Sequence, residues 1–217
     1  NNKQKFHDSN VSFIQNTSQS SNRFLTLVQK YAMARTLTKS IPLGFTAPSF
    51  SLINVVTGSQ NTLTELRGIN GTVIMFICNH CPFVIHVIDE IIAIANDYKH
   101  KNISFVAISS NDIDNYPDDS PQKMKEMAIE QQFPFPYLFD ETQATALAYN
   151  AVCTPEFNVF NHQNNCVYRG QMDDSRPGND SLNNGKDLRK ALDYVLQKKE
   201  LNFEQKPSMG CNIKWKN

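Results

Sequence analysis

The sequence predicts an α/β fold in which helices flank a central mixed sheet. A run of β-branched and aromatic residues at 73–77 is typical of a buried strand, and a helix is expected at 82–98. A second apolar strand is expected at 103–109, and strand, helix and strand within about 40 residues indicate a right-handed parallel βαβ unit. Two further strands, 152–160 and 166–171, are joined by a hairpin turn, so the sheet should also contain antiparallel pairs.

The length of 217 residues suggests one domain with extensions, since a domain has roughly 150 residues. We expect an N-terminal extension at 1–40, the domain at 41–199 and a C-terminal tail at 200–217. Residues 23–31 have the pattern of a short amphipathic helix. The extension is poor in acidic residues and rich in Ser, which fits either an organellar transit peptide or a solvated segment. A cytoplasmic and a mitochondrial location both agree with this composition.

The domain is predicted to begin with a β-hairpin at the edge of the sheet. Phe50 and Leu52 alternate with polar residues as on a half-buried strand. Residues 57–60 form the expected turn and 62–66 the returning segment. These residues carry no evident catalytic chemistry.

Two cysteines, Cys78 and Cys81, follow the strand at 73–77. Pro82 suits the first position of the next helix, because its missing N–H would have no partner there. Cys81 is therefore the expected N-cap, where first-turn N–H groups and the helix dipole stabilise a thiolate. We favour Cys81 as the nucleophile and Cys78 as its partner. The opposite order stays open, since a protonated His80 would lower the pKa of Cys78.

A Cys-x-x-Cys pair can also be half of a zinc site, but such a site needs a second ligand pair. The sequence contains no second Cys-x-x-Cys, and Pro82 stands where c-type haem attachment requires His. We therefore expect neither a metal nor another cofactor.

Helices and strands continue to alternate downstream of the βαβ unit. A helix at 122–132 is expected to be capped by Ser120, and a short helix at 144–150 by Asp140. The segment at 133–139 between them should enter a strand.

An acidic pair, Asp118 and Asp119, lies in a polar loop at 111–121. Two carboxylates could in principle perform acid–base chemistry. Since no apolar segment adjoins them in the sequence, we expect a solvated turn instead.

The chain ends with an amphipathic helix at 186–198, which should pack on the sheet, and with the tail. Because the tail contains Trp215 and Cys211, we do not expect it to be merely disordered.

The composition gives no support to several classes of partner. Lys and Arg number 21 and so do Asp and Glu, which gives no reason to expect nucleic acid or an anionic membrane as a partner. No apolar run approaches the roughly 18 residues of a membrane span. Five cysteines are an odd number, so at least one thiol is free, as is usual in a reducing compartment.

The order of elements resembles the thioredoxin superfamily, and more closely its redoxin branch of AhpC/TSA-like and TlpA/ResA-like proteins. The similarity covers about residues 42–196 and implies the thioredoxin fold. Three motifs carry the resemblance. Residues 47–52 and 63–68 are similar to the family's amino-terminal hairpin, and residues 94–98 are similar to the end of its active-site helix. The third motif is Thr154–Pro155. Residues 168–178 and 207–216 also look like a narrower group of thioredoxin-family proteins.

The resemblance implies roles for several residues. Counting back from residues 94–98 places Cys81 at the family's nucleophile position. Thr154 and Pro155 match the loop with a cis proline that docks an extended substrate beside the thiol. Cys153, two residues before Pro155, is either a substrate-facing thiol or a buried core residue.

The sequence also departs from the family. Val84 stands where a thioredoxin has its resolving cysteine. Residues 76–78 stand where a peroxiredoxin has the Pro and Thr of its peroxidatic loop. Both an ordinary thioredoxin cycle and ordinary peroxidase activity are therefore in question.

We favour a thiol–disulfide oxidoreductase. The Cys81 thiolate would attack a protein or small-molecule disulfide, and Cys78 would resolve the mixed disulfide. His80 would help to hold the thiolate, and a thiol reductant would regenerate the pair.

Two alternatives stay open. In a peroxiredoxin-like thiol peroxidase, Cys81 would become a sulfenic acid that another thiol captures, and Arg169 or Arg176 would polarise the peroxide. The capturing thiols would be Cys78, Cys153 or Cys211. In a redoxin-fold binding or structural subunit, the extension and the tail would be interaction surfaces in a protein complex.

Three further residues have predicted roles. Cys211 is either a resolving thiol that folds back from the tail or a packing residue. Cys166 and His86 are expected to be structural.

Overall fold

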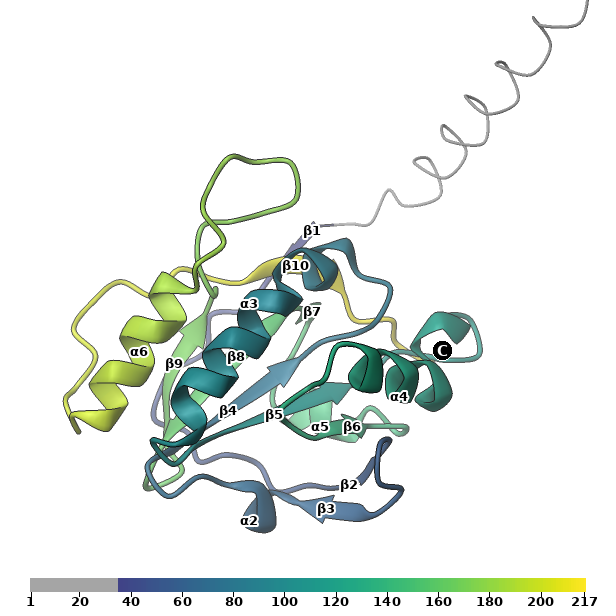
Figure 1. The fold of residues 1–217 in the computed structure, drawn as a ribbon, viewed down its shortest axis with the longest axis horizontal. Coiled ribbons are helices and arrows are strands. Elements are labelled where there is room, and N and C mark those ends of the chain that lie inside the picture. Colours follow the sequence, from purple (N-terminus) through teal and green to yellow (C-terminus); the bar gives the residue numbers. More distant parts are fainter. Residues whose placement is uncertain (1–34) are drawn as a thin grey trace, which may run out of the picture. The chain divides into compact units, whose positions relative to one another are not determined.

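The computed structural model describes residues 35–217, so the predicted helix at 23–31 lies outside the described residues. Its main sheet has seven strands: β2 (Ser51–Asn54), β3 (Gln60–Thr62), β4 (Gly71–Phe76), β5 (Ile103–Ser109), β6 (Tyr137–Phe139), β8 (Glu156–Asn161) and β9 (Cys166–Gly170). Their order across the sheet is β3-β2-β6-β5-β4-β8-β9 (Figure 1). The sheet contains parallel and antiparallel pairs, as predicted.

The central strand β4 positions the candidate site. It pairs in parallel with β5, from Gly71 opposite Ile103 to Phe76 opposite Ile108, and antiparallel with β8. All of its side chains are buried, because neighbouring strands flank it and other elements cover both faces. Helix α3 (Pro82–Lys99) connects β4 to β5, which confirms the predicted βαβ unit.

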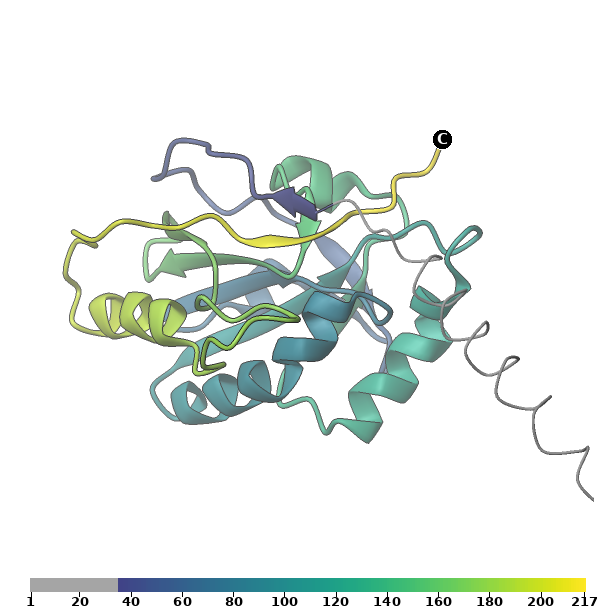
Figure 2. The ribbon, with the colours of Figure 1, turned by 90° about the horizontal axis from the view of Figure 1, so that it is seen from above.

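The helices lie on both faces of the main sheet (Figure 2). Helices α3, α4 (Pro121–Glu130) and α6 (Lys186–Leu196) lie on one face. The short helix α5 (Ala144–Ala148) lies on the other. Under α5 the core is dense in aromatic rings: the Tyr149 ring is 5.7 Å from that of Phe76 and 5.9 Å from that of Phe160.

A second, three-stranded sheet lies on the same side as α5 (Figure 2). It consists of β1 (Arg35–Leu37), β10 (Met209–Asn212) and β7 (Cys153–Thr154), in the order β1-β10-β7. Residues from the predicted extension and from the predicted tail thus lie in one small sheet with the segment before Pro155.

The N-terminal hairpin forms as predicted, at the edge of the sheet. Strand β2 pairs antiparallel with β3 on one side and with β6 on the other. The returning segment differs from the prediction, because Leu63–Leu66 is a helical turn, α2, and not a strand. Thr62 accepts a hydrogen bond from the Glu65 N–H, and the Glu65 carboxylate accepts one from the Thr62 N–H at 2.8 Å. This capping box favours the helical turn.

The capping box leads to a prediction about stability. Thr62→Ala should lower the free energy of unfolding by about 1 kcal/mol, because an N–H at the start of α2 loses its acceptor. Thr64→Ala, an exposed position of the same turn, is the matched control and should change the free energy of unfolding by less. Denaturant titration of both variants measures the difference. Equal effects would contradict the role of the cap.

The capping residues predicted for α4 and α5 have different outcomes. Ser120 is the N-cap residue of α4, although its side chain makes no capping hydrogen bond. The N-cap residue of α5 is Gln143 and not Asp140 as predicted, although the Asp140 carboxylate still accepts hydrogen bonds from the N–H groups of Thr145 and Ala146. None of the helices within residues 35–217 combines the length and apolar character of a membrane span.

Candidate active site

Cys81 is the N-cap residue of α3, as predicted. Strand β4 ends at Phe76, the Ile77 N–H still pairs with the Ile108 carbonyl at 3.0 Å, and the chain then turns through Cys78. Pro82 is the first residue of the helix. The sulfur of Cys81 therefore lies at the positive end of the 18-residue helix α3.

Cys78 from the same turn and two residues from distant segments, Thr154 and Cys211, surround Cys81. The Cys78 thiol lies 3.3 Å from the Thr154 hydroxyl, and the Thr154 carbonyl oxygen lies 3.2 Å from the Cys81 sulfur. The peptide bond between Thr154 and Pro155 is cis, as the resemblance implied. Cys211 of β10 hydrogen-bonds Cys81 as well. All three cysteines are buried and unbridged.

The hydrogen bonds determine which sulfur carries the charge. Burial by itself raises the pKa of Cys81, but the hydrogen bonds from Cys211, Cys78 and Thr154 outweigh it and lower this pKa well below its usual range. The pKa of Cys78 is raised by burial and by its bond to Cys81. The pKa of Cys211 is raised mainly by its bond to Cys81. These shifts favour Cys81 as the thiolate of the three, with Cys78 and Cys211 as thiol donors to it.

A pH titration tests this distribution. In the wild-type protein the Cys81 thiolate should give constant ultraviolet absorbance from mildly acidic to mildly alkaline pH, because its lowered pKa lies below that range. In Cys211→Ala one donor is lost, so the pKa of Cys81 should rise and the absorbance should appear at higher pH. Cys166→Ala, which removes a buried cysteine of β9, is the control. If the thiolate absorbance of Cys211→Ala appeared at the same pH as in the wild-type protein, Cys211 would not be a hydrogen-bond donor to Cys81.

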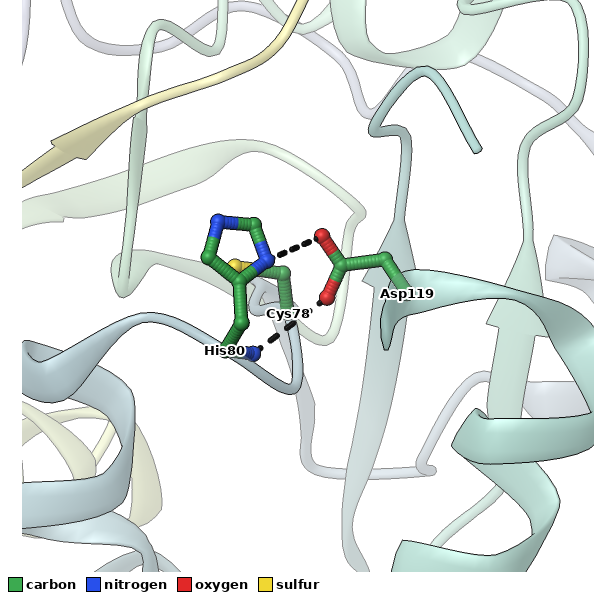
Figure 3. Close-up of side chains that lie close together, drawn as sticks. All are labelled: Cys78, His80 and Asp119. Carbon is green, nitrogen blue, oxygen red and sulfur yellow. Dashed lines mark hydrogen bonds and ion pairs between the residues drawn. The ribbon is translucent and has the colours of Figure 1, made fainter. Parts of the chain in front are cut away.

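His80 is held by the carboxylate of Asp119, a residue predicted to lie in a solvated turn (Figure 3). Asp119 is fully buried, and one of its oxygens lies 2.6 Å from His80 Nδ1. Its other oxygen accepts the N–H groups of Asn79 and His80. The His80 ring also stacks on Tyr116, with the ring planes 9° apart. The prediction of a solvated turn was therefore wrong for Asp119, since the N–H groups of Asn79 and His80 that bury it come from a segment about 40 positions away in the chain.

The imidazole lies beside the other thiol of the pair. Ligand atoms of Cys78, His80 and Asp119 all lie within 4.8 Å of one another (Figure 3). They do not fit a metal ion well, because N–H donors from Asn79, His80 and Asn111 already occupy the Asp119 oxygens. Because Nδ1 of His80 faces the Asp119 carboxylate at 2.6 Å, Nε2 is the ring nitrogen that does not face this carboxylate.

The two candidate arginines are bound elsewhere. Arg169 forms a buried ion pair with Glu156 at 2.6 Å and donates to Asn158 and to the carbonyls of Tyr149 and Asn150. Arg176 donates to the carbonyls of Asp173 and Ser175 and to Gln171. The hydrogen bonds of both guanidinium groups are thus directed to groups other than Cys81.

Cys153, Cys166 and His86 make contacts of the kind that stabilise a fold. Cys153 is buried against Thr38 and Glu156, and burial raises its pKa, which agrees with the core alternative. Cys166 is buried in the core, as predicted. His86 hydrogen-bonds Ser175 at 2.7 Å.

Residues 43–170 match the AhpC/TSA family. None of the curated proteins matches the chain. The crystal structure of an uncharacterized conserved protein from Geobacillus kaustophilus is 52% identical, with a TM-score of 0.83 over 85% of this chain and 98% of that chain. A hypothetical protein from Sinorhizobium meliloti is 39% identical, with a TM-score of 0.81 over 83% of this chain and 98% of that chain.

A more distant structure shares the fold alone. It is a thiol:disulfide interchange protein of the thioredoxin family from Chlorobium tepidum, 16% identical, with a TM-score of 0.56. The match covers 72% of this chain and 99% of that one. The thioredoxin fold of the described residues is thus established by structure as well as by sequence.

Proposed function

The chain belongs to the AhpC/TSA family, and from this membership we propose that it is a thiol–disulfide oxidoreductase with Cys81 as its nucleophile. The observation that carries the proposal is the setting of the Cys81 sulfur. It lies at the N-terminus of α3 and receives hydrogen bonds from two other thiols. A stabilised thiolate with a thiol beside it is what disulfide exchange requires.

The reaction begins on the substrate. The Cys81 thiolate attacks one sulfur of a disulfide, and the other sulfur leaves as a thiolate with the electron pair of the broken bond. The product is a mixed disulfide between Cys81 and half of the substrate. Protonation of the leaving thiolate completes the step.

Cys78 resolves the mixed disulfide. Its pKa is raised, so it is a thiol at neutral pH and must lose its proton to attack. His80, oriented by Asp119, is the base beside it and passes the proton to the departing substrate thiolate. A disulfide between Cys78 and Cys81 remains and the substrate is reduced. Two equivalents of an external thiol, which become a disulfide, return the pair to the reduced form. Cys211 is a second thiol within reach of Cys81 and is the alternative resolving residue.

Thr154 and Pro155 complete the site on the other side of the thiols. The Thr154 hydroxyl hydrogen-bonds Cys78, and the Thr154 carbonyl oxygen accepts a hydrogen bond from Cys81 when that residue is a thiol. Family membership keeps peroxide reduction as the second candidate, and the directions of the Arg169 and Arg176 hydrogen bonds weigh against it.

Stopped-flow kinetics of the reduced protein test the proposal. One series uses a small disulfide, dithiobis(nitrobenzoate), and the other uses hydrogen peroxide. We expect faster reaction with the disulfide and a product bond between Cys81 and Cys78 or Cys211, mapped by mass spectrometry. Faster reaction with peroxide would support the peroxidase, and no reaction of either reagent with Cys81 would support a binding or structural subunit.

A further inference from the structure

The C-terminal tail occupies the strand edge beside the nucleophile. β10 pairs antiparallel with β7, with Cys211 opposite Thr154 and Asn212 opposite Cys153 (Figures 1 and 2). Thr154 is the residue whose carbonyl lies 3.2 Å from the Cys81 sulfur. Pairing with this edge is therefore what brings the Cys211 thiol into hydrogen-bond contact with Cys81.

The fit of the tail depends on one glycine. A Cβ atom on Gly210 would lie 1.9 Å from the Thr154 carbonyl oxygen and 3.1 Å from the Pro155 nitrogen. No side chain is accommodated at such distances from a backbone, so β10 approaches β7 closely only because this position is glycine.

Hydrogen bonds fix the tail before and after β10. On the N-terminal side the Ser208 hydroxyl donates to the Gly170 carbonyl at 2.7 Å. On the C-terminal side the Ile213 N–H donates to the Val152 carbonyl at 3.0 Å. Gln143 donates to the Lys214 carbonyl at 2.8 Å and accepts the Lys216 N–H at 2.8 Å. The tail is thus an integral part of the site in the reduced protein.

An extended polypeptide can reach Cys81 by pairing with β7 as an added strand, in the way that β10 pairs with β7 and brings Cys211 to Cys81. We propose that β10 holds this place in the reduced protein, so that Cys81 reacts with small disulfides and excludes extended polypeptide disulfides. The inference rests on the proposed oxidoreductase function and specifies its substrate class. Cys211 stands where the cysteine of a polypeptide substrate would otherwise lie.

Two probes with the same leaving group test this selectivity. The small probe is dithiobis(nitrobenzoate). The large probe is a synthetic peptide with the sequence of residues 207–214, whose cysteine carries nitrothiobenzoate as a mixed disulfide. Attack by Cys81 on the small probe, or on the cysteine sulfur of the peptide probe, releases nitrothiobenzoate, which is followed by its absorbance. In the wild-type protein the peptide should react at least about tenfold more slowly than the small probe, since β10 must leave first.

Gly210→Ala should allow the peptide probe to reach Cys81. Its Cβ atom cannot fit against Thr154, so β10 is displaced, and the ratio of the peptide rate to the small-probe rate should rise at least about tenfold. Gln143→Gly is a milder second variant, which removes two anchors of the tail and suits the positive φ of 64° at this position. It should raise the ratio in the same direction. Cys166→Ser is the control, because it removes a buried thiol of β9 but keeps Gly210 and the strand pairing, and its ratio should stay at the wild-type value.

Hydrogen exchange of the amides in β10 shows whether the strand has been displaced. Fast exchange in Gly210→Ala or Gln143→Gly together with an unchanged rate ratio would overturn the inference. Equal reactivity of the wild-type protein with both probes would overturn it as well. If wild-type Cys81 does not react even with the small probe, the oxidoreductase function itself fails, and that outcome is seen separately.

Discussion

Cys81→Ser should lower the rate of disulfide reduction by at least about a thousandfold, because a serine hydroxyl is not ionised and does not attack a disulfide. Cys78→Ser should behave differently. Its Cys81 still lies at the N-terminus of α3 and still receives a hydrogen bond from Cys211, so the first attack should persist. The mixed disulfide should then accumulate unless Cys211 resolves it.

Rapid mixing with dithiobis(nitrobenzoate) separates the two variants. The first release of nitrothiobenzoate reports attack, and the second reports resolution. Cys166→Ser changes a buried cysteine in β9 and serves as the control for the loss of any thiol. The nucleophile assignment would be wrong if Cys81→Ser released nitrothiobenzoate at the wild-type rate and Cys78→Ser did not.

Asp119→Asn should slow the resolving step by about a hundredfold, the usual size of a general-base effect, while leaving the first attack nearly unchanged. The asparagine keeps the size of the side chain, but it has one acceptor oxygen and no charge. It cannot serve both the backbone N–H groups of Asn79 and His80 and the Nδ1 of His80, as the carboxylate does. His80 would then lose the orientation in which it takes the proton of Cys78. Asp119 is in this account a positioning residue.

The pH dependence distinguishes this role from simple loss of stability. Since the pKa of Cys78 is raised, its thiolate fraction without a base grows about tenfold for each pH unit. Resolution in Asp119→Asn should therefore recover as the pH rises, whereas in the wild-type protein it should depend less on pH. Asp118→Asn, the exposed neighbour, should match the wild-type protein. Equal pH profiles for Asp119→Asn and the wild-type protein would rule out the relay.

Local sequence patterns predicted the strand and the helix start that position the site. The apolar run of β4, Pro82 at the first helical position and the cysteine before it depend on neighbouring residues, and each was found as expected. The N-cap position of Cys81 followed from the same local rules. The segment at 63–66 was misassigned, because the capping box of Thr62 and Glu65 outweighs the hairpin pattern there.

Long-range contacts could not be predicted in the same way. Asp119 meets His80 through the packing of a loop against the turn at Cys78, and nothing in the spacing of these residues indicates that contact. The place of Cys211 depends on the pairing of β10 with β7, between segments 57 residues apart at Thr154 and Cys211. The sequence indicated a tail with a thiol, and the register brought this thiol to Cys81.

The central claim is that Cys81 is the thiol that attacks a disulfide. The most direct measurement is mass spectrometry of the double variant Cys78→Ser/Cys211→Ser after brief reaction with dithiobis(nitrobenzoate), because neither neighbouring thiol can then resolve the adduct. The account predicts one nitrothiobenzoate per chain, located at Cys81 by peptide mapping. An adduct at Cys153 or Cys166 instead, or none at all, would contradict it.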